Sequence, residues 1–158
     1  MATNEVFEYA REAANDDVRA TLDWLVANGF VLERTAGGPD AGFGDVVVEL
    51  ARGGAETVTI VRDRSQWTCD IQPDGMNTQP LDVLLAAMTG DQRALDPAPW
   101  PLEEPLPGQW PPGVAWRDAV PALLEWLSSG PRAADVNAAA DQWRLARKKY
   151  WQDRLGEA

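Results

Sequence analysis

The feature that most constrains the fold of this chain is a stretch, from Asp45 to Gln72, in which apolar and polar residues alternate. Successive side chains of a β-strand point to opposite faces of a sheet, so this alternation predicts strands that are covered on one face only. Turn residues divide the stretch into three runs, at positions 46–51, 57–61 and 66–72. We therefore predict a three-stranded antiparallel meander whose apolar face lies on the core.

Helical periodicity flanks the meander on both sides. Apolar residues recur at helical spacing between positions 4 and 29, and again in three segments after position 80. Asn15 is a favourable N-cap residue and favours two helices in the first region, with one continuous helix through Asn15 as the alternative. The run Phe30–Thr35 predicts one further strand, at the edge of the sheet.

Together these elements predict an α+β fold in a single domain that spans residues 1–158. In this fold an antiparallel β-meander of three to four strands is covered by N-terminal and C-terminal helices. A chain of this length is able to bury about 70% of its unfolded surface. Its expected parts are an N-terminal helical region (1–29), an antiparallel sheet (30–75) and a helical region (80–158) that contains a Pro/Trp-rich connecting loop (97–116).

Four glycines lie in the segment 36–44, AGGPDAGFG, between the predicted edge strand and the meander. Glycine-rich loops sometimes cradle phosphate groups, but this segment matches neither of the usual phosphate-binding patterns. We therefore expect a flexible connection.

Proline dominates the segment 97–112, PAPWPLEEPLPGQWPP, which holds seven of the twelve prolines in the chain. Proline fixes φ and lacks a backbone donor, so the segment favours extended backbone without ladder pairing. We expect a rigid strap across the domain, anchored by Trp100 and Trp110. The alternative is a preorganised binding loop, since proline lowers the entropy that ordering costs.

The formal net charge of −11 is unevenly distributed. Residues 1–131 carry 8 basic and 21 acidic side chains, a net charge of −13, whereas residues 132–158 carry 6 and 4, a net charge of +2. A field of this sign repels nucleic acid and anionic membranes and accelerates encounters with basic partners. The simpler interpretation is that the charge serves solubility alone.

The chain contains no histidine and a single cysteine, Cys69. Ser-His-Asp and Cys-His catalysis, imidazole zinc sites and intramolecular disulfides are thereby excluded. A carboxylate-only site built from Asp63, Asp70 or Asp74 remains as an alternative, although carboxylates near turns are usually solvated. We expect no enzymatic activity and no cofactor. The N-terminus lacks the pattern of a signal peptide and no run is long enough to span a membrane, so we expect a cytoplasmic protein.

Three stretches, GFGDVVVELARGG, VTIVRDRSQW and PLDVLLAAMTG, together with the tryptophan-rich C-terminal part, give the chain a recognisable layout. In the order helix, meander, helices, it resembles the immunity proteins of bacterial polymorphic toxin systems. The resemblance implies a protein that binds one cognate toxin domain and blocks its active site or its folding. The acidic body would then steer the chain onto a basic toxin, such as a nuclease.

We therefore expect a non-catalytic immunity protein, a monomer or weak dimer that binds neither nucleic acid nor membranes. An acidic secretion chaperone or adaptor that binds an effector is the first alternative, and a carboxylate-only enzyme the second. The candidate partner-binding residues are Asp63, Asp70, Asp74, Trp100, Glu103, Glu104, Trp110 and Trp116.

Overall fold

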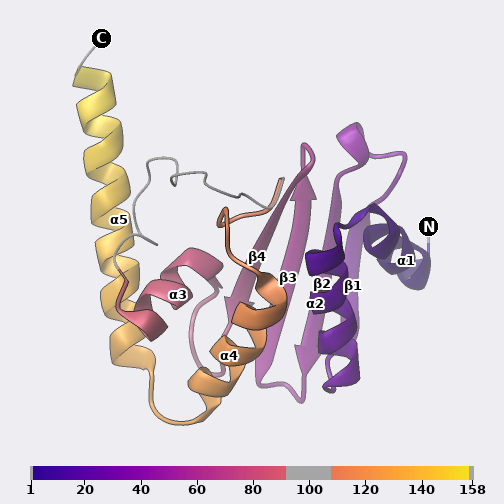
Figure 1. Ribbon diagram of the computed structural model, residues 1–158, viewed down its shortest axis with the longest axis horizontal. Helices are drawn as coiled ribbons and strands as arrows, with labels where there is room; N and C mark the ends of the chain where they lie inside the picture. Colours follow the sequence, from indigo (N-terminus) through magenta and orange to yellow (C-terminus); the bar gives the residue numbers. More distant parts are fainter. Residues whose placement is uncertain (1, 92–107, 157–158) are drawn as a thin grey trace.

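The computed structural model describes residues 2–91 and 108–156 of the chain (Figure 1). It confirms the predicted α+β fold, in which helices flank an antiparallel sheet. In chain order the elements are α1 (Thr3–Ala13), α2 (Asp16–Ala27), β1 (Val31–Gly37), the short 3-10 helix η1 (Gly42–Gly44), β2 (Val46–Arg52), β3 (Glu56–Asp63), β4 (Gln66–Gln72), β5 (Gln79–Pro80), α3 (Leu81–Thr89), α4 (Trp116–Ser128) and α5 (Ala133–Gly156).

The sheet has the strand order β1-β2-β3-β4-β5, and each neighbouring pair is antiparallel. The predicted meander forms its centre, where Val48 pairs with Ile60 and Ile60 with Cys69. All three side chains are buried on the same face, as the alternation predicts. β1 is the predicted edge strand. The two-residue strand β5, which pairs with β4 at Asp70 and Ile71, was not predicted.

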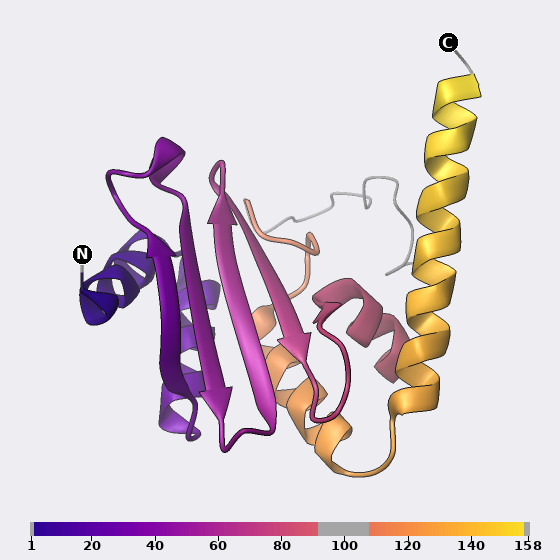
Figure 2. The same cartoon turned by 180° about the vertical axis from the view of Figure 1, so that it is seen from behind.

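The helices lie over one face of the sheet. α2 and α4 cover the central strands, α3 continues this layer past β4, and α5 packs on α3 (Figure 1). Among the described residues the opposite face carries no helix, as Figure 2 shows. α1 lies beside α2 and contacts β1 and β2. None of the helices in the described part of the chain has both the length and the apolarity to cross a membrane.

Asn15 separates α1 from α2 and excludes the alternative of one continuous helix. Its side-chain oxygen accepts a hydrogen bond from the backbone N–H of Val18 at 2.9 Å, the contact of an N-cap residue. α2 then runs to the glycine turn at Gly29, whose φ is +88°.

α4 begins at Trp116, so that Pro121 lies inside the helix and not at its first position. The reason is a cap from a distant helix. The carboxylate of Asp17 in α2 accepts hydrogen bonds from the backbone N–H groups of Trp116, at 2.8 Å, and Arg117, at 3.0 Å. These donors have no partner within the first turn of a helix, so an external acceptor extends the helix backwards.

The described end of the proline-rich segment lies along the start of β4. Gln109 forms a parallel bridge with Trp67, and the N–H of Trp110 donates to the carbonyl of Trp67 at 2.8 Å. Residues 108–110 thus lie against the sheet, as expected for a strap, and residues 97–107 lie outside the described part of the chain. The expectation that this segment forms no ladder pairing is wrong at residues 108–110. Residues 108–110 are not prolines, so their backbone donors remain free to pair.

Candidate protein-binding site

The predicted carboxylates do not converge. Asp63 ends β3, Asp70 lies in the middle of β4, and Asp74 follows the other end of β4. A seven-residue strand spans roughly 20 Å, so Asp63 and Asp74 are too far apart to share a ligand. Among residues 2–91 and 108–156, no three carboxylate or cysteine side chains come together as metal ligands. The carboxylate-only site consequently gains no support from the geometry.

Two of the three candidate tryptophans, Trp110 and Trp116, lie in the part of the chain that the structure describes, and neither is exposed. Trp116 is 0% exposed, and its indole N–H donates to the carbonyl of Trp110 at 3.0 Å. Trp110 itself is half-buried. The structure thus corrects the expected position of Trp116, because a large apolar ring gains more from the core than from the surface. Trp100, Glu103 and Glu104 lie outside the described residues.

Asp82, in the first turn of α3, is a buried carboxylate. It accepts a hydrogen bond from the indole N–H of Trp143 at 3.1 Å and lies 3.7 Å from the guanidinium of Arg147, both in α5. Burial raises the pKa of Asp82, and burial together with the charge of Asp82 raises the pKa of Asp70. These contacts fasten α5 to α3, and we assign the cluster a structural role.

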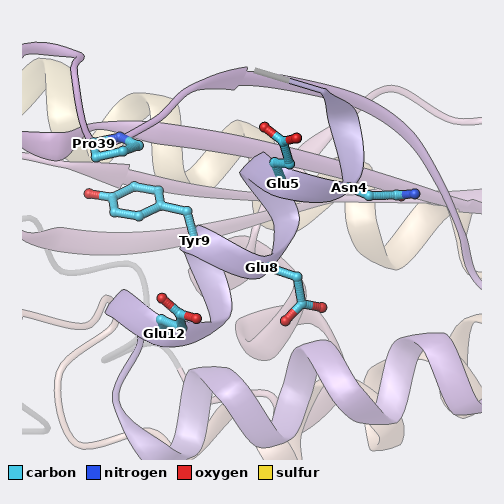
Figure 3. Close-up of a pocket in the computed structure, with 6 residues that line it drawn as sticks. All are labelled: Asn4, Glu5, Glu8, Tyr9, Glu12 and Pro39. Carbon is cyan, nitrogen blue, oxygen red and sulfur yellow. The ribbon is translucent and has the colours of Figure 1, made fainter.

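An acidic groove lies along the exposed face of α1. The groove has a volume of about 440 Å³. Its lining residues are Asn4, Glu5, Glu8, Tyr9, Glu12 and Pro39. Figure 3 shows Tyr9 extending beneath Pro39, with the three carboxylates spread along the helix. Their spacing of i, i+3 and i+7 places all three on one side of α1.

Two of these carboxylates have no counter-charge among the residues that the structure describes. Glu8 pairs with Arg11 at 3.2 Å, and Arg11 also binds Asp23 of α2 at 2.8 Å. Within the described residues, Glu5 and Glu12 form neither an ion pair nor a side-chain hydrogen bond. The groove therefore presents net negative charge to any molecule that enters it.

Tyr9 fixes the wall of the groove. Its hydroxyl donates to the carbonyl oxygen of Gly44 at 3.0 Å and accepts a hydrogen bond from Arg62 at 3.3 Å. The same Arg62 nitrogen lies 3.3 Å from the Gly44 carbonyl. α1, β3 and the loop after β1 are joined at this point, and the tyrosine ring lies next to Pro39 of that loop (Figure 3).

The segment 36–44 was expected as a flexible connection. Its first two residues end β1, and the loop 38–45 that follows is a hydrogen-bonded turn. Backbone hydrogen bonds join Gly38 to Asp45 at 3.0 Å and Ala41 to Gly44 at 2.9 Å. The carboxylate of Asp45 also accepts from the N–H of Arg64 at 2.9 Å. The glycines indicated flexibility, whereas contacts with distant residues close the loop. It projects from the end of the sheet beside α1 (Figures 1 and 2).

A second hollow lies on the other side of this loop. It has a volume of about 280 Å³, and its walls include Ala41 and Asp45 of the loop together with Val47 and Val61 from the open face of the sheet. The loop 38–45 thus separates an acidic groove from a largely apolar hollow.

Sequence reasoning missed the acidic groove. Glu5, Glu8 and Glu12 were not among the candidate partner-binding residues. The spacing of Glu5, Glu8 and Glu12 was an available signal for an acidic helix face. The presence of Pro39 beside Tyr9 had no such signal, because it depends on the folded loop. The chain matches no protein-family model, no curated protein and no solved structure.

Proposed function

We propose that this chain is a non-catalytic immunity protein, which binds a cognate basic toxin domain and neutralises it. The observation that carries the proposal is the acidic groove of α1. There Glu5 and Glu12 lie exposed beside the fixed ring of Tyr9, with no counter-charge from residues 2–91 or 108–156. Exposed carboxylates of one sign accelerate the association with a basic protein surface. The layout that resembles immunity proteins supports the same function.

The chemistry of the groove suits a positively charged protein surface. Lysine and arginine side chains are able to extend their apolar stems over Tyr9 and Pro39 while their cationic ends meet the carboxylates. A folded basic domain that covers the groove would lose access to its own anionic substrate. Inhibition then follows from occlusion and does not require a chemical step by this chain.

The test begins with the wild-type chain as bait in lysate of its native host. We expect a folded basic protein to co-purify one-to-one, and we expect the purified complex to inhibit the activity of that protein. Recovery of an extended segment by a dimer of the bait would overturn the proposal in favour of a secretion chaperone.

A charge-reversal pair then tests the groove with the purified partner. The variant Glu5→Lys/Glu12→Lys should lower the association rate constant about tenfold or more, since it reverses the local field. The matched control, Glu125→Lys/Asp153→Lys, changes the net charge equally at exposed positions that lie outside the groove and are not candidate partner-binding residues. Equal loss in both variants would show that the groove has no special role.

A further inference from the structure

Phe43 occupies an unusual place at the tip of loop 38–45. Its side chain is 76% exposed, the largest exposed fraction among the exposed large hydrophobic residues in the described part of the chain. Its backbone adopts a left-handed conformation, with φ of +59° and ψ of +14°. L-residues with bulky side chains rarely adopt this region, because the Cβ atom crowds the backbone.

The fold itself gives no reason for phenylalanine at this position. Phe43 is absent from the core cluster and from the partly buried residues packed against it. Glycine or asparagine adopts the left-handed region at lower cost and would leave no apolar ring in water. A residue that is strained and exposed at once points to a role outside folding.

The loop holds Phe43 rigidly in place. The backbone on both sides of the loop is closely packed. A Cβ atom on Gly44 would displace the hydroxyl of Tyr9, and one on Gly37 would overlap the backbone carbonyl of Asp45. Tyr9 and Arg62 both bind the Gly44 carbonyl, directly after Phe43. The ring is therefore displayed on a backbone that is already ordered, which lowers the entropy lost on binding.

The surroundings of Phe43 indicate the chemistry of its partner. Pro39, four residues earlier, lines the acidic groove, and Ala41 lines the apolar hollow. The exposed carboxylates of Asp40 and Asp63 add negative charge to the same end of the molecule. An apolar anchor within a charged rim is the arrangement found at the energetic centre of many protein interfaces.

We propose that Phe43 is the anchor of the interface, and that the basic partner receives its ring in an apolar pocket rimmed by lysine or arginine side chains. This inference rests on the proposed function, because it names the recognition element at the same site. The groove carboxylates steer the partner towards the chain, and the aromatic ring holds it after docking. The carboxylates therefore act mainly on the association rate constant, and the aromatic ring acts mainly on the dissociation rate constant.

The test uses the purified basic partner and the full chain with Phe43→Gly. Glycine fits a φ of +59°, so the unfolding midpoint should stay the same or rise. The dissociation constant should nevertheless increase about thirtyfold or more, as for an interface hot spot, mainly through faster dissociation. Leu145→Ala is the matched control, because Leu145 is 67% exposed on α5 and lies outside both hollows.

The outcomes separate the inference from the proposed function. If Glu5→Lys/Glu12→Lys weakens binding while Phe43→Gly binds as tightly as the wild type, the proposed anchor role of Phe43 is wrong. The proposal that the acidic groove binds the partner is then retained. If wild-type bait captures no folded basic protein, the proposed function is overturned and the anchor with it. A loss with Phe43→Gly equal to that with Leu145→Ala would also overturn the anchor.

Discussion

The carboxylate of Asp17 binds the backbone N–H of Trp116 at 2.8 Å, although the two residues are 99 positions apart in the chain. Asp17 also accepts hydrogen bonds from the N–H of Arg117 and from the side chain of Gln109. One buried acid near the start of α2 thus organises the start of α4 and the end of the strap. This carboxylate therefore fixes Gln109 and the start of α4 to α2.

Asp17→Ala should lower the free energy of unfolding by about 3 kcal/mol, because it removes a helix cap and leaves buried donors without an acceptor. Chemical denaturation monitored by tryptophan fluorescence measures this. Asp16→Ala is the control: Asp16 is exposed, and its ion pair with Arg19 should contribute about 0.5 kcal/mol or less. Similar midpoints for the two variants would contradict a capping role.

The raised pKa of Asp82 predicts the pH dependence of stability. A carboxyl group with a higher pKa in the folded chain binds protons more tightly there than in the unfolded chain. From the ordinary value of 3.8 up to the raised value, the free energy of unfolding should therefore fall as the pH rises. Asp82→Asn removes this contribution, so the stability of the variant relative to wild type should increase with pH through that window. If the free energies of unfolding of wild type and variant changed in parallel with pH, Asp82 would not contribute to the pH dependence of stability.

The close approach of Gly44 to Tyr9 predicts a difference between two neighbouring glycines. Gly44→Ala should destabilise the fold by about 2 kcal/mol, since it combines a left-handed φ of +68° with an overlap against the Tyr9 hydroxyl. Gly42→Ala has open space around the added methyl group and should leave the thermal midpoint almost unchanged. Differential scanning calorimetry of both variants measures this. Equal thermal midpoints for the two variants would mean that the loop shifts to accommodate a methyl group at Gly44 without loss of stability.

Cys69 should be unreactive in the native state. Its thiol is buried in the core, and burial raises its pKa above the ordinary value. A chromogenic disulfide reagent at neutral pH should therefore modify the chain only at the rate of its unfolding, and rapidly once guanidinium chloride is added. Fast labelling without denaturant would contradict the buried position of Cys69.

Local patterns in the sequence were sufficient for the sheet and most of the helices. The alternation around Val48, Ile60 and Cys69 predicted which face of each strand is buried, because side-chain direction in a strand depends only on residue parity. The cap at Asn15 likewise depends on a residue three positions away. Features that depend on residues only a few positions apart can therefore be predicted from the sequence alone.

Tertiary structure decided the position of the candidate site. The acidic groove exists because the loop 38–45 folds back onto Tyr9, a contact between residues 35 positions apart. Trp116 is buried because Asp17 draws the start of α4 onto α2. The glycines and prolines indicated where the chain is able to turn, but the direction of each turn depends on hydrogen-bond partners that only the folded chain brings near. The sequence by itself thus determined the elements and their buried faces, and long-range contacts decided which polar and aromatic side chains remained on the surface.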